Sequence, residues 1–297
     1  MAIPANPTLA TLAAEGLKKA GQTSPDTALA TRAEGVWMEE AKNDIFFLSS
    51  KYNKKLKSLY AVSVTMCAIG KSRYAMPSNF GGDLTLTILD GNETGTAQSG
   101  TVGSITLAAD EGMAEAFALG KNILITSGTG VGSMSQITAY STTTKVASIT
   151  PNFTTAPDAT SGYMVIDNYR MLIPTGDINI EALADPTLSG KPIKYSHIGS
   201  STYGEIRLDF APDKAYGLQM RYYVDLSLTD LSSTLMTTLY RKWRNLWIQK
   251  VKASALFELN DSEAKKEMDK YYEYVEIVIN EETGGTDLGT INYEVRT

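Results

Sequence analysis

Apolar residues recur every three or four positions near the start of the chain. In the stretch RAEGVWMEEAKNDIFFLSSKY this spacing is kept by Trp37, Ala41, Ile45, Leu48 and Tyr52. Such a stripe is typical of an amphipathic helix that buries one face. The charged residues Glu39, Glu40, Lys42 and Asp44 lie mostly off the stripe, where they are expected to face water.

A second helix is predicted after a break at Asn53 and the KKLK cluster. This helix would run through Leu56, Leu59, Ser63, Met66 and Gly70. Pro77 then ends the helical segment, because proline cannot continue a helix and pushes the preceding residue towards an extended conformation. We therefore expect residues 7–74 to be helical.

The pattern from about Phe80 to Tyr223 is that of β structure. Short runs rich in Ile, Val, Thr and Tyr are separated by turn clusters such as DGNETG, STTT and APDATSG. The runs are DLTLTIL, GSITLA, NILITSG, SQITAY, KVASIT, GYMVID, INIEAL, GEIRLDF and GLQMRYYV. Alternation in DLTLTIL and at Ile178 and Ile180 predicts sheets with one dry face. EGMAEAFALG predicts a short helical interruption.

Helical spacing returns from about Leu226. The stretch LTDLSSTLMTTLYRKWRNLWIQKVKASALFEL aligns the apolar residues Leu231, Leu235, Leu239, Leu246 and Val251 along one side. Asp261 or Ser262 is expected to cap a last helix. The final stretch, NEETGGTDLGTINYEVRT, loses the period and reads as an extended tail with one strand-like run, TINYEV.

Together these patterns predict an α+β fold. Helices from both termini need apolar partners, which one helical bundle formed by both ends would supply. The expected organisation is N-terminal bundle helices over 1–76, an inserted antiparallel β domain over 77–224 with a small module at about 120–167, C-terminal bundle helices over 225–280, and an extended tail over 281–297.

Composition and charge narrow the function classes. A chain of 297 residues with 43% hydrophobic and 20% charged residues is typical of a globular protein. The net charge of −6 argues against a nucleic-acid clamp, which needs clustered cations. No run approaches the roughly 20 apolar residues of a membrane span, and the first 21 residues read as a short helix instead of a secretion signal. We expect a soluble protein.

The single cysteine and single histidine limit the possible chemistry. Cys67 alone excludes an internal disulfide and a thiolate-rich metal site, and its place in the apolar run YAVSVTMCAIG favours a buried structural thiol in a helix. His197 would have to serve any Ser-His-Asp triad alone. Its context, KYSHIGSSTYG, is turn-like and favours a surface or interface histidine.

The stretch GTGVGSMSQ carries three alternating glycines after the run ILITS and invites comparison with a phosphate loop. Such a loop needs a helix N-terminus after the turn and, in the Walker form, a Gly-Lys-Ser/Thr end. Here the strand-like SQITAY follows. The glycines are therefore expected to supply positive φ angles in a hairpin.

The remaining motifs favour structural roles. Paired carboxylates in WMEE, ADEG and NEET are expected to be solvated. DGNETG has alternating oxygen donors but lacks the rest of a calcium loop, so it offers at most a weak ion site. In YRKWRNLWIQK the tryptophans are expected in the core, with the cations in water: Arg241, Lys242, Arg244 and Lys250. We predict no cofactor, no metal and no catalytic residue.

Several stretches in their shared order resemble head-to-tail adaptor proteins of short-tailed bacteriophages. RAEGVWMEEAKNDIF followed by YAMPSNF resembles the opening helices and their Tyr-x-x-Pro-x-x-Phe exit. GKPIKYSHIG and GEIRLDFAPDKAYGLQMRYYVD, followed by LSLTDLSSTLM, are similar to the closing β segment, where a Pro-Asp and Tyr-Tyr stretch leads back to the helices. The region from NILITSGTG to PDATSGYMVI is similar to a small β module of phage structural proteins, although SGTGVGSMSQ lacks the charged residue usual after the glycines.

The resemblance implies a non-enzymatic structural protein of the virion neck or tail, assembled in the host cytoplasm. It would form a ring, commonly of twelve copies, below the portal protein. The ring would extend the channel through which DNA passes without specific binding, and would dock the tail nozzle and in some cases fibres. An acidic lumen suits this passage, because retention of DNA needs multiple cationic contacts.

The tail after Gly284 and Gly285 has too little apolar content to fold alone. We expect this tail, or the N-terminal segment, to order on meeting the portal or a neighbouring copy. Its candidate contact residues are Asn292, Tyr293 and Val295.

Two rival functions remain at this stage. The β region could be a glycan- or receptor-binding module attached to a virion, with Tyr140, Tyr163 and Tyr203 as stacking residues, although it holds no tryptophan. A hydrolase using Ser or Asp with His197 is the third reading, and it lacks a nucleophile-elbow motif.

Overall fold

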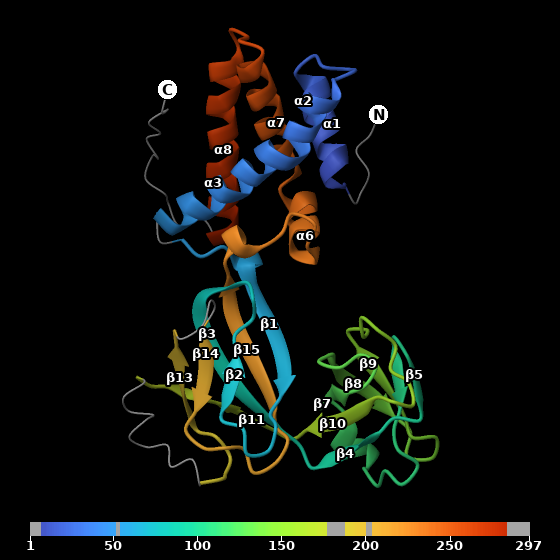
Figure 1. Ribbon diagram of the computed structural model, residues 1–297. Coiled ribbons are helices and arrows are strands. Elements are labelled where there is room, and N and C mark those ends of the chain that lie inside the picture. Colours follow the sequence, from blue (N-terminus) through green and yellow to red (C-terminus); the bar gives the residue numbers. More distant parts are fainter. Residues whose placement is uncertain (1–6, 52–53, 177–187, 200–203, 284–297) are drawn as a thin grey trace. The chain divides into compact units, whose positions relative to one another are not determined.

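The computed structural model describes residues 7–51, 54–176, 188–199 and 204–283 (Figure 1). The structure is mixed α+β with antiparallel sheets, which confirms the fold class at this level. The chain divides into two compact units. A helical unit comprises Met1–Tyr60 and Tyr223–Thr297, and a β unit comprises Ala61–Tyr222. The expected boundary near residue 76 therefore differs from the observed division at Tyr60.

The helical unit consists of helices from both ends of the sequence. They are α1 (Leu9–Lys19), α2 (Thr27–Arg32), α3 (Met38–Lys51), α6 (Thr234–Lys242), α7 (Arg244–Glu258) and α8 (Ala264–Thr283). A π-helical stretch, Ala33–Trp37, joins α2 to α3. Side chains of Thr8, Asp26 and Ser233 cap α1, α2 and α6 by accepting backbone N–H groups.

Close packing of α1 on α7 holds the N-terminal and C-terminal helices together in this unit. At Gly16 an added Cβ would lie 2.6 Å from the Cβ of Val251, so only glycine allows this approach. α7 and α8 lie side by side, and α3 contacts both (Figure 1). The predicted stripe on α3 is confirmed, because Trp37, Ala41, Ile45 and Leu48 are buried. Tyr52 lies outside the described residues.

The C-terminal helical run is interrupted once. α6 and α7 meet at Trp243, whose φ of −106° and ψ of 32° are not helical. Both Trp243 and Trp247 are buried there, and the indole N–H of Trp247 donates to the carbonyl oxygen of Leu239 at 3.3 Å. The helical spacing of apolar residues therefore continues from α6 into α7, because both helices bury apolar side chains in the same core.

The described strands of the β unit form three sheets. Their strands are β1 (Tyr60–Met66), β2 (Arg73–Ala75), β3 (Phe80–Asp90), β4 (Glu93–Thr96), β5 (Ser99–Thr101), β6 (Ser104–Thr106), β7 (Asn122–Ser127), β8 (Met134–Tyr140), β9 (Val146–Thr150), β10 (Gly162–Ile166), β11 (Asn168–Met171), β12 (Ile173–Pro174), β13 (Lys194–Ile198), β14 (Glu205–Leu208) and β15 (Gly217–Val224). The sheet orders are β1-β15-β3-β11, β4-β10-β7-β8-β9-β6-β5 and β12-β13-β14-β2.

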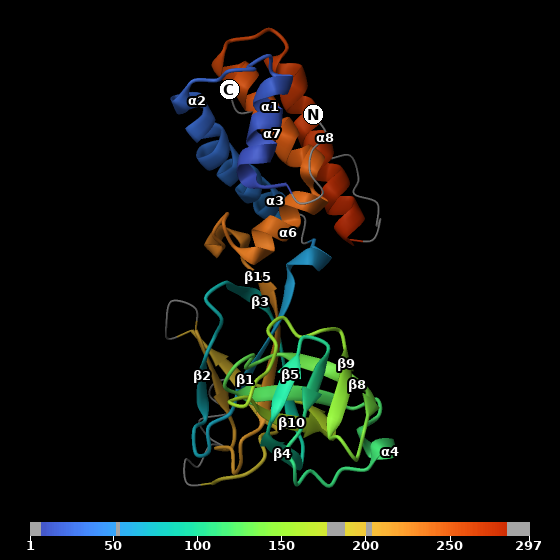
Figure 2. The ribbon, with the colours of Figure 1, turned by 90° about the vertical axis from the view of Figure 1, so that its right-hand side faces the viewer.

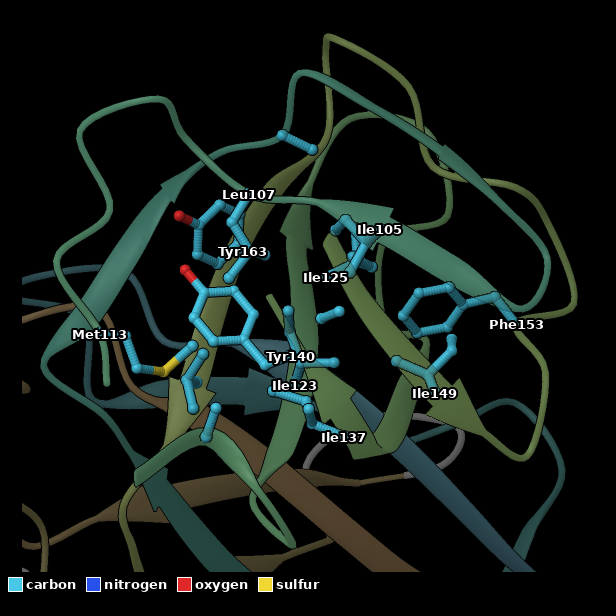
Figure 3. Close-up of a cluster of buried hydrophobic side chains, with 14 residues drawn as sticks. Ile105, Leu107, Met113, Ile123, Ile125, Ile137, Tyr140, Ile149, Phe153 and Tyr163 are labelled. Carbon is cyan, nitrogen blue, oxygen red and sulfur yellow. The ribbon is translucent and has the colours of Figure 1, made fainter. Parts of the chain in front are cut away.

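The seven-stranded sheet encloses its own hydrophobic core, in which Ile105, Ile123, Ile137 and Val165 are fully buried (Figure 3). The short helix α4 (Glu115–Ala118) contacts β8, the central strand of this sheet (Figure 2). Because its strands run from Glu93 to Ile166, this body begins earlier than the module expected at about 120–167.

The predicted helix through Leu56 to Gly70 is wrong. Tyr60–Met66 forms strand β1, and only the short 3-10 turn Lys57–Leu59 precedes it. The run YAVSVTM is rich in β-branched residues, which favour strands. Apolar residues three or four positions apart also occur in an alternating strand, so the spacing alone could not separate the two structures. The predicted strand at INIEAL lies outside the described residues.

Candidate interaction surfaces

The predicted contact residues of the tail, Asn292, Tyr293 and Val295, lie outside the described residues. Within the described residues, the candidate sites are the glycine hairpin, two groups of buried acids and an exposed edge strand.

The glycine-rich stretch forms the turn between antiparallel strands β7 and β8, as predicted. Gly128, Gly130 and Gly132 have φ angles of +70°, +80° and +84°, which side chains rarely adopt. Across the turn, the Gly132 N–H donates to the carbonyl oxygen of Ile125 at 2.9 Å, and the Ile125 N–H donates to that of Ser133 at 2.9 Å. The tip presents Val131 with 60% of its surface exposed.

A carboxylate fastens this tip to the loop before β10. Asp158 accepts hydrogen bonds from the hydroxyls of Thr160 at 2.6 Å and Thr129 at 2.7 Å. These bonds, with the Thr160 N–H, hold the pKa of Asp158 below its ordinary value. An ionised carboxylate beside the turn would repel a phosphate group, and the turn is followed by a strand instead of a helix. The hairpin geometry therefore gives no phosphate cradle.

An open pocket of about 360 Å³ lies beside the same hairpin. Val64–Met66 of β1, Leu124–Thr126 of β7, and Val131 and Gly132 of the tip line it. None of these residues is ionisable, so the pocket offers apolar contact and backbone groups but no acid–base chemistry.

A buried acid occupies the core of the seven-stranded sheet. Glu111 is 6% exposed, which contradicts the expectation that ADEG is solvated. Its carboxylate accepts hydrogen bonds from the Tyr163 hydroxyl at 2.7 Å and the Met113 N–H at 3.2 Å. The hydroxyls of Tyr140 and Tyr163 point to the same side of the core (Figure 3). Within the described residues the Tyr140 hydroxyl has no hydrogen-bond partner.

Glu93 of β4 lies close to this cluster. Burial, and then the negative charge of Glu111, raise the pKa of the Glu93 carboxyl. Burial also raises the pKa values of both tyrosines, so their hydroxyls stay protonated at neutral pH. We call Glu93, Glu111, Tyr140 and Tyr163 the acid–tyrosine cluster.

In the helical unit, by contrast, buried acids meet lysines. Glu282 is 2% exposed, although NEET was expected to be solvated. It accepts hydrogen bonds from the N–H and hydroxyl of Ser58 at 2.8 Å each, and it forms an ion pair with Lys242. Burial alone would raise the pKa of Glu282, but the bonds from Lys242 and Ser58 outweigh burial and lower it.

Lys42 and Lys250, both predicted to be solvated, are buried. Lys250 is 6% exposed, lies 3.2 Å from both Asp44 and Glu40, and stacks over the Tyr271 ring. Lys42 is 2% exposed and donates to the carbonyl oxygen of Thr229 at 3.1 Å. Long side chains can cross an apolar layer to reach acids, which helical spacing alone does not reveal. These cations serve packing and are not available to bind phosphates.

The lone cysteine and lone histidine have ordinary surroundings. Cys67 is buried after β1, and burial raises the pKa of its thiol to about 11, which disfavours a reactive thiolate. The predicted buried thiol is confirmed, but not its helix. His197 is exposed, as predicted, yet it lies on strand β13 instead of in a turn. Its ring packs edge-on against Phe80 at 5.0 Å between centroids.

In the stretch DGNETG, considered above as a weak ion site, the carboxylate of Asp90 forms ion pairs with two lysines. Asp90 lies 2.6 Å from the amino groups of both Lys191 and Lys214. Burial would raise the pKa of Asp90, but these two lysines lower it overall. Among the residues that the structure covers, no group of three or more His, Cys, Asp or Glu side chains is placed to hold a metal ion.

One exposed surface was missed from the sequence. Tyr169, Met171 and Ile173 are 47%, 69% and 56% exposed along β11 and β12. The signal was the alternation in NYRMLIP, which stands between two more regular runs. Exposed apolar stripes of this kind often mark interaction sites.

Comparison with known proteins places the chain in no family. No protein-family model matches it, and no curated protein matches it. In the described part of the chain, no helix has both the length and the apolar character needed to cross a membrane.

Proposed function

We propose that this protein is a non-enzymatic head-to-tail adaptor of a short-tailed bacteriophage virion. Copies would form a ring below the portal, commonly of twelve, which extends the DNA channel and docks the nozzle and, in some cases, fibres. The protein would act in the neck or tail of the virion after assembly in the host cytoplasm. This proposal rests on the sequence resemblance described above.

The proposed architecture is a bundle of helices from both termini, an inserted β domain and an extended C-terminal tail. One observation carries the proposal furthest: α1 packs against α7 and α3 against α8, while residues 61–222 form a separate compact unit. In the proposed adaptor, the helical bundle and the inserted β domain would each supply separate surfaces for assembly contacts.

Exposed apolar side chains on the helices support contacts between copies. Large hydrophobic residues of the helical unit with about half or more of their surface exposed include Val36, Phe47, Leu228, Phe257, Leu259 and Ile277. A closed ring requires two different surfaces on each copy to meet. The net charge of −6 suits a channel that does not retain DNA.

The ionisable groups also support a structural role. The buried acids Glu111 and Glu282 are satisfied by a tyrosine, a serine and a lysine, and the thiol of Cys67 is protonated at neutral pH. An active site is expected to combine perturbed groups with an accessible cleft. The described pocket is instead lined by residues without ionisable side chains.

The test is to measure the mass of the purified protein alone and mixed with the phage portal protein, and to image both by electron microscopy. A closed ring, or ring formation on the portal, is expected. A protein that stays monomeric under both conditions would contradict the proposal.

The glycan-binding alternative is weakened by the burial of its named tyrosines. Tyr140 and Tyr163 are 3% and 1% exposed, so neither can stack on a sugar, and Tyr203 lies outside the described residues. A monomer that binds oligosaccharides would favour this alternative. The hydrolase reading would be revived only by turnover that His197→Ala abolishes.

A further inference from the structure

The edge strand β11 combines two features of a docking site for another strand. It is the last strand in the order β1-β15-β3-β11, so no described strand of this sheet pairs with its outer side. Its side chains Tyr169 and Met171, with Ile173 beyond it, are about half or more exposed. Proteins usually protect such apolar edges, because they invite pairing with another chain.

The outward direction of the backbone groups follows from the hydrogen bonds of the ladder. Leu172 donates its N–H to the carbonyl oxygen of Leu86 at 2.9 Å, directly opposite it in the register of β11 and β3. Bonding residues alternate along an antiparallel strand. The N–H and C=O groups of Tyr169 and Met171 therefore point away from β3.

The opposite edge of the sheet is less open. There the glycine hairpin approaches β1, and a Cβ added at Gly132 would lie 3.4 Å from the carbonyl oxygen of Val64. β12 is also paired, because Ile173 donates its N–H to Ile193 at 3.0 Å. The open length of backbone is therefore β11 itself.

The C-terminal residues carry a matching pattern. In TINYEVR the apolar residues Ile291, Tyr293 and Val295 alternate with polar ones, so a strand would place all three on one face. This pattern complements the stripe on β11 and β12, which has the same spacing.

We propose that β11 receives the segment Thr290–Arg296 of a second copy of this chain as an antiparallel strand. Opposing Met171 to Tyr293 brings Tyr169 opposite Val295, which pairs apolar residues on one face. The same register sets Arg170, which is exposed, opposite Glu294 on the other face. Apolar and opposite-charge pairs across strands are each stabilising, so both faces favour this register.

This inference deepens the proposed ring, on which it rests for the choice of a second copy as donor. A ring needs a contact in which each copy gives one surface and receives another. The six residues 284–289 would span at most roughly 20 Å between the end of α8 and the docked strand. Strand exchange would therefore link adjacent copies directly.

A disulfide experiment tests the exchange on the full chain. The variants Met171→Cys and Tyr293→Cys are made separately, mixed and oxidised. Opposed residues in a bonded antiparallel pair have Cα atoms about 5.5 Å apart, within disulfide range. The native Cys67 is buried, and any cross-linking through it is measured in the wild-type protein and subtracted. Non-reducing electrophoresis is expected to show a heterodimer joined through these two positions.

The matched control mixes Met171→Cys with Asn292→Cys, because residue 292 would face the other side of the strand. We expect at least tenfold less cross-link in this mixture. Equal cross-linking in both mixtures, or none in the first, would overturn the proposal. A disulfide formed only within single chains of the Met171→Cys/Tyr293→Cys double variant would overturn exchange between copies.

The two proposals fail in different ways. Cross-linked chains that never close into a ring would leave strand exchange standing and contradict the adaptor. Closed rings without the cross-link would overturn strand exchange alone. Met171 is 69% exposed, and circular dichroism of each cysteine variant checks that it folds.

Discussion

Two sets of carboxyl groups, one in the helical unit and one in the acid–tyrosine cluster of the β unit, meet opposite kinds of partner. In the helical unit, Glu282 and Glu267 lie against lysines, and the pKa of each is lowered. In the acid–tyrosine cluster of the β unit, Glu111 meets a tyrosine hydroxyl and a second acid, Glu93, whose pKa is raised. Whether ionisation of a glutamate stabilises or destabilises the folded state therefore depends on its partners. The helical acids favour folding when charged, whereas Glu93 favours it when neutral.

The largest expected effect is at Glu282. Glu282→Ala leaves the N–H of Ser58 and the amino group of Lys242 without their carboxylate, and it should lower the free energy of unfolding by about 2–4 kcal/mol. Urea unfolding followed by tryptophan fluorescence measures this, because Trp37, Trp243 and Trp247 all belong to the helical unit. The neighbouring exposed Glu281→Ala is the control. An equal effect of both variants would show that the ion pair is unimportant.

The next effect is at Glu267, which accepts hydrogen bonds from Lys252 and Lys270 at 2.7 Å and from Gln249 at 2.9 Å. Burial would raise its pKa, but these partners lower it from 4.5 to about 2. Its contribution is therefore present above pH 4.5 and lost as the pH falls towards 2.

Glu267→Gln should cost about 2 kcal/mol at pH 7 and should flatten the loss of stability between pH 5 and 2. Unfolding curves across this range check the prediction, with exposed Glu263→Gln as control. A wild-type loss that persists unchanged in Glu267→Gln would assign the acid sensitivity to other groups.

In the β unit, Tyr163→Phe should cost about 1 kcal/mol, because the lost hydroxyl both donates to Glu111 and accepts from the Ala108 N–H. Tyr140→Phe is the matched control. Its hydroxyl is buried without a described partner, so its removal should be neutral or slightly stabilising. Amide exchange of β7 and β10 reports both. A larger loss at Tyr140 would mean that its hydroxyl has an important partner.

The smallest effect has the opposite sign. Glu93→Gln should stabilise the β unit by about 0.5 kcal/mol at pH 7, because it removes a negative charge beside Glu111. Folding raises the pKa of Glu93. The protonated side chain therefore contributes to stability below pH 4.5, and this contribution is lost as the pH rises through the pKa of the folded state. The variant's advantage should therefore vanish below pH 4.5.

Amide exchange of β4 and β10 at pH 7 and at lower pH measures this difference. The exposed Glu115→Gln on α4 controls for charge alone. Destabilisation by Glu93→Gln at neutral pH would show that its carboxylate is needed in charged form, and would end the contrast between the two units.

Sequence patterns predicted the elements whose apolar residues follow one periodicity or whose turns are marked by glycine. The stripe on α3 and the glycine hairpin are confirmed, because helical spacing and positive φ angles are local properties. The strand at Tyr60–Met66 was missed, because its apolar spacing fits both periods. The break at Trp243 was missed, because the apolar pattern continues through it.

Buried charges were the least predictable feature. Glu111, Lys250 and Glu282 all look solvated in sequence, since each stands beside other charged or polar residues. Each has a partner that lies at least 52 positions away in the chain: Tyr163 for Glu111, Asp44 for Lys250 and Ser58 for Glu282. No local pattern carries this information.

The sequence by itself determined the class of the fold, the glycine turn, the scarcity of reactive side chains and the alternating pattern at the C-terminal end. These follow from residue type and short-range geometry. Only the tertiary structure decided which acids form ion pairs with lysine and which accept a hydrogen bond from tyrosine, and that β11 presents an open apolar edge. Those features depend on which distant segments become neighbours, because burial and pairing act through space.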